Sequence, residues 1–170
     1  MIRKLALAAL AAGLLTAPAL AAEKIKVETS KGCSFEIALR PDLAPKHVAQ
    51  ITKLAKAGFY NGIVFHRVIE GFMAQTGDPT GTGMGGSNEP DIKAEFSQEP
   101  FRRGTVGMAR SQDPDSGNSQ FFIMFADGDF LNGQYTVWGQ VDETGMACVD
   151  KIQRGEPPAN PDKMTKVTVE

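Results

Sequence analysis

The chain has 170 residues, of which 42% are hydrophobic, and it carries 18 Lys and Arg against 20 Asp and Glu. This length fits one domain. The formal net charge of −2 at pH 7, without a cluster of Lys and Arg, argues against a nucleic-acid partner.

The first residues have the pattern of an export signal. Arg3 and Lys4 form a short basic region, residues 5–22 carry no charge, and Ala19-Leu20-Ala21 supplies the small residues that a signal peptidase recognises. The uncharged run reaches the lower edge of a membrane span. Its high alanine content and its Gly and Pro favour a cleaved signal over an anchor.

We therefore expect residues 1–21 to be a cleaved signal peptide and residues 22–170 to form a single domain. The cut would fall after Ala21 or Ala22. Export implies that the mature protein is periplasmic or secreted, with no membrane attachment.

The rest of the chain is dominated by short runs of alternating apolar and polar residues, the pattern of half-buried strands. One segment instead has Val48, Ile51 and Leu54 at helical spacing and is followed by Gly58, a common residue after a helix end. In chain order, the patterns predict strands at residues 25–27, 33–39, 63–69, 105–109, 119–125, 135–141 and 166–169, and helices at residues 45–57 and 145–153. Many short strands with two helices indicate a β-sandwich or a β-barrel, and this pattern does not separate the two.

Residues 77–93 are rich in Gly, Asp, Pro and Asn and are predicted to form a long loop. Within it, residues 81–86 have the spacing G-x-G-x-x-G. A dinucleotide site needs that run between a strand and a helix, and Ser87-Asn88-Glu89-Pro90 does not start a helix immediately. No cofactor is therefore expected.

The predicted strand at residues 119–125 has large apolar groups on both faces. One face holds Phe121, Ile123 and Phe125, and the other holds Gln120, Phe122 and Met124. We expect the first face to fill the interior of the fold. The second would form an outer groove, because an apolar face that contains an amide fits a binding surface better than a second dry core.

Two runs carry the residues with the most specific chemistry. Residues 65–75 read Phe-His-Arg-Val-Ile-Glu-Gly-Phe-Met-Ala-Gln, and residues 117–123 read Gly-Asn-Ser-Gln-Phe-Phe-Ile. If the first run is a strand, a bend at Gly71 and a second strand, Arg67 can face the same groove as Met73 and Gln75. A fixed cation beside an apolar surface suits one task well, namely holding a proline ring and perturbing the peptide bond before it.

That bond rotates slowly because amide resonance sets a barrier of about 18–20 kcal/mol. Rotation removes the resonance and leaves a lone pair on the proline nitrogen, so a donor aimed at this atom stabilises the twisted state more than either planar isomer. An arginine in apolar surroundings is suited to this role, since it is always charged and its fork is rigid. No nucleophile, metal ion or cofactor is required.

Together the two runs resemble the signature segments of the cyclophilins, and the resemblance extends from about Lys26 to Ile152. It implies a mainly β fold, a closed eight-stranded antiparallel β-barrel with an α-helix closing each end. It also implies a peptidyl-prolyl cis-trans isomerase that acts on X-Pro bonds of unfolded or extended polypeptides. With the predicted export signal, this enzyme would assist protein folding in the periplasm. Such polypeptides would be its transient partners, and we expect the protein to be a monomer.

The resemblance also assigns roles to individual residues. Arg67 is the expected catalytic residue, and His66 beside it is expected to be structural or a hydrogen-bond partner. The expected substrate-binding residues are Phe72, Met73, Gln75, Ala109, Arg110, Ser111, Gln120, Phe122, Phe130, Leu131 and Tyr135. The apolar side chains would hold the proline ring, the two glutamines would bind the substrate backbone or orient the arginine, and residues 109–111 would pair with the substrate's main chain.

Four positions depart from the family's best-known pattern. Phe130 stands where a tryptophan is common, Tyr135 where a histidine is, Arg110 where an asparagine is, and Glu70 where a proline is. Phenylalanine at position 130 lacks the indole N–H, so we expect weaker inhibition by cyclosporin, the family's inhibitor.

Two other functions are compatible with parts of the pattern. A non-catalytic peptide-binding or holdase module could use the same scaffold, although it has no need of Arg67. A small-ligand barrel of lipocalin type would need a hollow interior. The large side chains predicted to fill that interior are Phe35, Phe121, Ile123, Phe125 and Trp138.

The two cysteines, Cys33 and Cys148, leave two alternatives open. In an oxidising compartment they could form one disulfide, or they could be separate buried thiols that pack as small apolar residues. They have no histidine neighbours at metal-ligand spacing, and His47 and His66 lie on different predicted elements, so no metal site is expected.

Overall fold

The computed structural model of the protein describes residues 23–170. The predicted signal peptide lies outside the described residues. Within the described range, no helix combines the length and apolar character needed to span a membrane.

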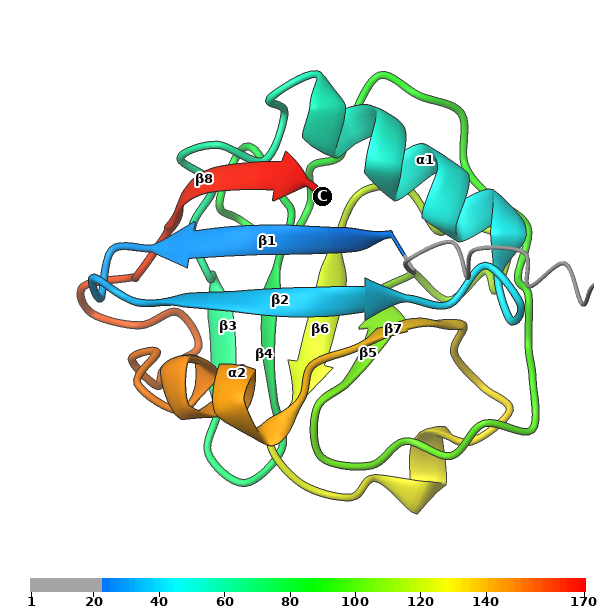
Figure 1. Ribbon diagram of the computed structural model, residues 1–170. Coiled ribbons are helices and arrows are strands. Elements are labelled where there is room, and N and C mark those ends of the chain that lie inside the picture. Colours follow the sequence, from blue (N-terminus) through cyan, green and yellow to red (C-terminus); the bar gives the residue numbers. More distant parts are fainter. Residues whose placement is uncertain (1–22) are drawn as a thin grey trace, which may run out of the picture.

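Residues 23–170 fold into eight strands, two α-helices and one 3-10 turn (Figure 1). In chain order these are β1 (Lys24–Thr29), β2 (Ser34–Leu39), α1 (Pro45–Lys56), β3 (Arg67–Ile69), β4 (Met73–Thr76), β5 (Thr105–Met108), β6 (Phe121–Met124), η1 (Asp129–Leu131), β7 (Val137–Gln140), α2 (Glu143–Val149) and β8 (Met164–Val169). The predicted elements are all present with shifted bounds. β3 covers only the end of the strand predicted at 63–69, and α2 begins and ends earlier than predicted.

The strands form one antiparallel sheet in the order β3-β4-β6-β5-β7-β2-β1-β8. In Figure 1, β1 and β2 run across the front of β3, β4 and β6, with β8 beside β1, so the sheet curls into a half-barrel. α1 packs on β8 and β7, and α2 packs on β2 at the opposite side of the molecule.

The expected closed barrel is wrong, because the edge strands β3 and β8 do not pair along their lengths. The chain before β3 meets the chain before β8 at an isolated bridge between Val64 and Lys163. On its outer edge, Val68 of β3 instead exchanges two backbone hydrogen bonds of 2.8 Å with Gly155. The segment between α2 and β8 thus lies where a closing strand would have to be.

Two apolar clusters lie on opposite faces of the sheet. The inner cluster contains Phe121, Ile123 and Trp138, and the rings of Phe121 and Trp138 meet edge to face with centroids 5.3 Å apart. The other cluster, called the outer cluster below, contains Phe122 and Met124. The predicted division of this strand between two faces is confirmed. Because side chains of the described residues fill the interior, the lipocalin-type alternative is not supported.

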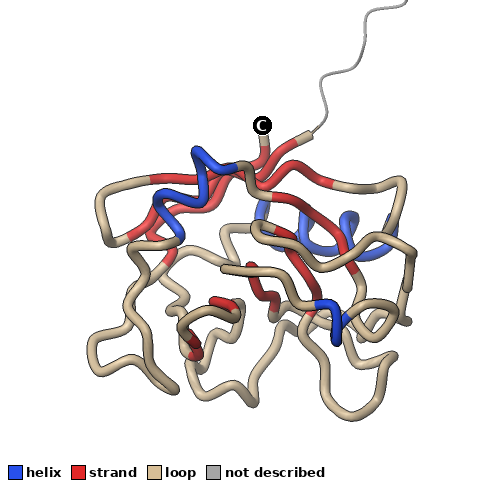
Figure 2. The backbone as a smooth tube through the Cα atoms, turned by 90° about the horizontal axis from the view of Figure 1, so that it is seen from below, coloured by secondary structure: helices blue, strands red, loops and turns tan. Residues whose placement is uncertain are grey.

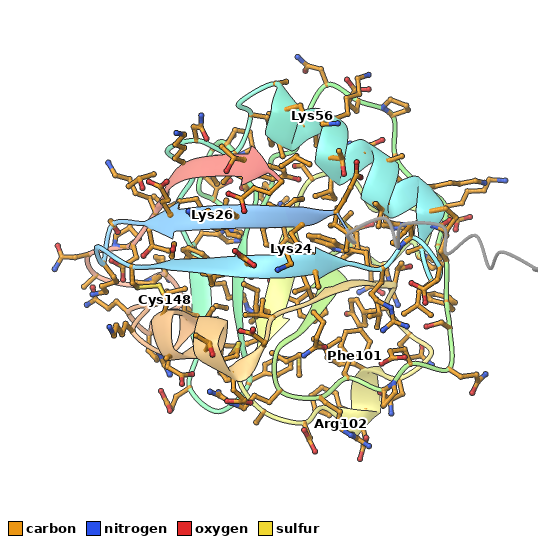
Figure 3. The ribbon with its side chains drawn as sticks, in the orientation of Figure 1. Lys24, Lys26, Lys56, Phe101, Arg102 and Cys148 are labelled. Carbon is orange, nitrogen blue, oxygen red and sulfur yellow. A yellow bond between two sulfur atoms is a disulfide. The ribbon has the colours of Figure 1, made fainter. Side chains whose placement is uncertain are left out.

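Cys33 and Cys148 form a disulfide with a Cα–Cα distance of 5.8 Å. The bond, drawn in yellow beside Cys148 in Figure 3, joins the chain before β2 to α2. Oγ1 of Thr29, at the end of β1, lies 3.6 Å from both sulfur atoms. The bond therefore holds α2 against the β1–β2 hairpin, and disulfides of this kind typically stabilise a fold by about 2–4 kcal/mol.

Long loops make up much of the side of the molecule seen in Figure 2. Residues 77–104 connect β4 to β5 without a helix or an extended strand, and the connection from β6 to β7 contains η1. Loops held on a rigid sheet are a common place for binding residues.

Candidate active site

The register of the sheet places three candidate residues in one row. Arg67 on β3 is opposite Gln75 on β4, and Gln75 is opposite Phe122 on β6. Residues opposite one another on antiparallel strands point to the same face. The fold-back at Gly71 predicted from the sequence therefore brings a guanidinium, an amide and an aromatic ring side by side.

A glycine makes room for the aromatic ring of this row. Gly107 on β5 is opposite Phe122, and a Cβ at position 107 would lie 2.5 Å from the Phe122 ring and 2.7 Å from that of Phe101. The two rings stack with their centroids 5.7 Å apart. Any larger residue at position 107 would displace one or both rings, so the glycine allows Phe122 to lie where it does.

All three residues of the row line a cavity of about 560 Å³. The cavity is lined by His66, Arg67, Phe72, Met73, Gln75, Gly81, Thr82, Gly83, Ala109, Arg110, Phe122, Leu131, Tyr135, Glu156 and Pro157. Ten of the thirteen residues predicted from the sequence are among them. Its volume is in the range of sites that bind small groups.

The floor of this cavity is apolar and rigid. Met73, Phe122 and Leu131 are buried, and all three belong to the outer apolar cluster. Tyr135 packs edge-on against the Phe122 ring with centroids 5.6 Å apart. A proline ring placed here would be surrounded by apolar atoms that have little freedom to move.

Phe130 stands at the rim and does not line the cavity. Its side chain is 70% exposed, and its ring lies 5.5 Å from that of Phe72, measured between centroids. Phe72 does line the cavity. Phe130 therefore extends the apolar surface of the site outward from Phe72.

The side chain of Arg67 lines the cavity together with Glu156. The Arg67 side chain is 45% exposed, and its Nε donates a hydrogen bond of 3.0 Å to Oε1 of Glu156. Among residues 23–170 this is its one ion pair. The nitrogens at the end of the guanidinium are free of protein partners in the described chain and can donate to a bound peptide.

Two glutamines connect the arginine's row to a loop. Nε2 of Gln75 donates to Oε1 of Gln120 at 3.0 Å, and Nε2 of Gln120 donates to the carbonyl oxygens of Gly83 and Gly85 at 3.0 and 2.8 Å. Both amides are thus held in one orientation. The loop at residues 81–86 serves here as an anchor for Gln120.

Asp78 organises that loop. Its carboxylate accepts hydrogen bonds from the backbone amides of Thr80, Thr82, Gly83 and Gly85 at 2.6–3.1 Å. Burial by itself would raise the pKa of Asp78, but these bonds and that from the Thr80 hydroxyl lower it to about 2. Asp78 was not predicted from the sequence, although an aspartate followed by Pro79 shortly before a glycine-rich run is a usable signal for such a turn.

A second cavity of about 490 Å³ continues the groove. Ser111 and Gln120, which do not line the first cavity, line this one. Gln75, Gly83, Ala109 and Arg110 line both cavities, so they mark the junction between the two. An extended peptide bound in the first cavity would pass this junction.

Arg110 is fixed at the junction by neutral groups. Its guanidinium lies 4.5 Å from the centre of the Tyr135 ring and donates to the carbonyl oxygens of Gln134 and Ser111 at 2.8–3.0 Å. No acidic side chain of the described residues forms an ion pair with it. Its positive charge is therefore left to interact with whatever the groove binds.

His66 lines the cavity beside Arg67 but makes no hydrogen bond to another residue of the described chain. Burial lowers the pKa of His66, the nearby carboxylate of Asp78 opposes this, and the charge of Arg67 adds to it. The ring is therefore neutral at pH 7. Both predicted supporting roles of His66, structural or hydrogen-bond partner, stay predictions.

Glu156 and Pro157 also line the first cavity, and neither was predicted from the sequence. They lie between α2 and β8, and 89 positions separate Glu156 from Arg67 in the chain. Nothing in the local pattern marks such a contact.

Among residues 23–170 there is no group of three or more His, Cys, Asp or Glu that could hold a metal ion.

Comparison with known proteins places this fold and groove in a family. Residues 24–169 match the family model described as cyclophilin type peptidyl-prolyl cis-trans isomerase/CLD. The chain belongs to the cyclophilin family. This cyclophilin is 57% identical over 171 positions to a probable peptidyl-prolyl cis-trans isomerase of Brucella suis, covering 91% of this chain and 87% of the relative. It is 43% identical over 133 positions to a peptidyl-prolyl cis-trans isomerase of Helicobacter pylori, covering 76% and 80%.

Solved cyclophilin structures have the same fold. The crystal structure of the cyclophilin AquaCyp293 from Hirschia baltica matches with a TM-score of 0.77 at 31% identity, covering 85% of this chain and 73% of that one. A cyclophilin-type isomerase from Cryptosporidium parvum matches with a TM-score of 0.79 at 26% identity, covering 87% and 97%. The predicted family and enzyme class are confirmed: this cyclophilin is a peptidyl-prolyl cis-trans isomerase. The non-catalytic binding module is not favoured.

Proposed function

We propose that this cyclophilin is exported and assists folding in the periplasm by isomerising X-Pro bonds in unfolded or extended segments of other proteins. The N-terminal pattern supports export. The Cys33–Cys148 disulfide agrees with an oxidising compartment, because such bonds are rare where thiols are kept reduced. The open groove suits a transient polypeptide partner, and we propose that the enzyme acts as a monomer.

The observation that carries the mechanism is the position of Arg67 at the edge of the apolar floor. A proline ring resting on Met73, Phe122 and Leu131 would place its nitrogen near the guanidinium. As the bond twists, that nitrogen gains a lone pair, and Arg67 donates to it. The apolar floor lowers the local dielectric and strengthens this interaction.

The energy required is modest. An acceleration of roughly 10³- to 10⁵-fold corresponds to about 4–7 kcal/mol of transition-state stabilisation. One charged hydrogen bond in a partly desolvated site, together with immobilisation of the flanking peptide, is enough to supply it. Gln75, Gln120 and residues 109–111 would hold the peptide on either side of the proline.

Export and folding assistance can be tested together. The full chain is expressed in a Gram-negative bacterium, the cells are fractionated, and the mass of the recovered protein is measured. The purified protein is then added to a client whose refolding is limited by prolyl isomerisation, with the Arg67→Ala variant as the matched control.

We expect periplasmic protein that begins at residue 22 or 23 and that accelerates refolding, while Arg67→Ala does not. Uncleaved protein in the membrane or cytoplasm would contradict export. Equal acceleration by the Arg67→Ala variant would contradict the proposed catalytic role.

A further inference from the structure

The segment between α2 and β8 is fixed against the strand that carries Arg67. Gly155 exchanges two backbone hydrogen bonds with Val68, the residue after Arg67. Arg154 forms an ion pair with Glu70 in the turn after β3. The two backbone hydrogen bonds hold residue 155 at β3's outer edge, so the backbone from which the Glu156 side chain extends has a defined position. The Arg154–Glu70 pair adds little to this, since the Glu70 side chain is 77% exposed.

Glu156 extends from this segment to Arg67. Its Oε1 accepts a hydrogen bond from Nε of Arg67 at 3.0 Å, and both side chains line the same cavity. The carboxylate contacts the side of the guanidinium nearer the arginine's own stem. The two terminal nitrogens, with four N–H groups, are left for the peptide.

A contact of this kind matters more for geometry than for folding. The two side chains are 45% and 55% exposed, and pairs this open contribute little to stability. An exposed arginine otherwise moves among several rotamers, and its guanidinium points in a different direction in each of them. A hydrogen bond to Nε fixes the plane of the guanidinium and hence the direction of its terminal N–H groups.

We propose that Glu156 is a positioning residue that holds the guanidinium of Arg67 in the plane in which its terminal nitrogens face the proline nitrogen. This inference rests on the proposed catalytic role of Arg67. Glu156 moves no proton, since isomerisation transfers none. The contact requires only an oxygen that accepts a hydrogen bond from Nε. The neutral amide of a glutamine, which has the same length, can therefore replace the carboxylate.

The test compares Glu156→Ala with Glu156→Gln, using exchange spectroscopy on a short X-Pro peptide. We expect Glu156→Ala to lower the isomerisation rate at saturation about fivefold, with peptide affinity within about twofold of the wild type. Glu156→Gln keeps an oxygen for Nε, so its rate stays within about twofold. Glu70→Ala is the matched control, because it breaks the neighbouring ion pair of the same segment without touching Arg67, and it should leave the rate unchanged.

A spectroscopic signal separates positioning from a merely structural role. The Nε–H resonance of Arg67, assigned by its absence in Arg67→Lys, is expected to be slow in hydrogen exchange in the wild type and in Glu156→Gln. It should exchange rapidly in Glu156→Ala.

Three results would overturn the proposal. They are a wild-type rate in Glu156→Ala, an equal loss in Glu70→Ala, and a Glu156→Gln variant as slow as Glu156→Ala. If Arg67→Ala itself kept the full rate, the catalytic role of Arg67 and this inference would both fall. That outcome is distinct from a failure of Glu156 alone, in which Arg67→Ala still loses its rate.

Discussion

β6 presents two apolar faces, and they differ in what lies beyond them. Phe121 and Ile123 point into the curl of the sheet, where Trp138 and the other side chains of the inner cluster surround them. Phe122 and Met124 point the other way, into a smaller cluster. Phe122 borders the cavity that Arg67 shares.

The difference shows how one strand can serve stability and activity separately. A closed cluster contributes to the stability of the fold because it excludes water on all sides. A cluster that ends in a cavity keeps part of its apolar surface available to a ligand. Under the proposed function, this surface would be fully buried only when a proline ring is bound. Neighbouring residues on β6 should therefore have different effects when they are replaced.

The pair Phe121→Ala and Phe122→Ala tests this most strongly. Phe121→Ala should lower the free energy of unfolding by about 3–5 kcal/mol, because it leaves a cavity in the closed core, and the isomerase rate of the folded protein should stay unchanged. Phe122→Ala should destabilise the fold less and should weaken peptide binding at least about tenfold. Urea unfolding and peptide titration measure the two effects.

The same two variants can also contradict this difference between the two faces of β6. Equal losses of stability with unchanged peptide affinity in both variants would mean that the outer cluster is simply a second core. Loss of peptide affinity in Phe121→Ala at a temperature where it is fully folded would mean that the two faces are coupled through the strand.

Acid should lower the free energy of unfolding by protonating Asp78, whose carboxylate holds the loop at residues 81–86. Because its pKa is lowered from 3.8 to about 2 in the folded protein, its ionised form stabilises the fold above about pH 4, and this stabilisation is lost as the pH falls toward 2. The difference is worth about 2 kcal/mol. Urea unfolding from pH 2 to 7 should show the stability gap between wild type and Asp78→Asn shrinking below pH 4.

Asp78→Asn should also lower the isomerase rate at pH 7, since Gln120 is anchored by the loop that Asp78 holds. A gap in stability that does not vary with pH would contradict the assignment of the low pKa to this carboxyl. The inner-face variant Phe121→Ala has its ionisable groups unchanged and serves as the control for acid effects.

The smallest expected effect is at the rim. Phe130→Trp adds an indole N–H beside Phe72, and one new hydrogen bond to cyclosporin should lower its inhibition constant by roughly three- to tenfold, corresponding to about 1 kcal/mol. Isomerase activity on a short peptide should not change, because position 130 lies outside the cavity. An inhibition constant that stays the same would show that the missing N–H does not limit binding of this ligand.

Local patterns predicted the parts of the molecule that depend on near neighbours. Alternation along residues 120–125 predicted both faces of β6, and the fold-back at Gly71 predicted that Arg67 and Gln75 face the same groove. Phe122 joins that row through the pairing of β4 with β6, which the local pattern did not predict. What could not be predicted depends on segments far apart in the chain. The sheet stays open because residues 154–156 lie beside β3, and the same segment brings Glu156 to Arg67 across 89 positions.

The disulfide shows the same limit. Composition allowed a bond between Cys33 and Cys148, but their distance depends on how α2 packs against β2. The bounds of β3 are a third case, since residues before Arg67 pair at an isolated bridge with the chain before β8 instead of continuing the strand.

The most direct test of the account is an NMR exchange measurement on one X-Pro peptide with wild-type protein and with Arg67→Ala, recording the isomerisation rate and the peptide affinity in the same samples. The account predicts that the substitution lowers the rate at saturation by roughly 10²- to 10³-fold, as removal of a transition-state hydrogen-bond donor does elsewhere. It predicts that affinity changes little, because the apolar floor is intact. A rate that is unchanged while the peptide still binds would contradict the role assigned to Arg67.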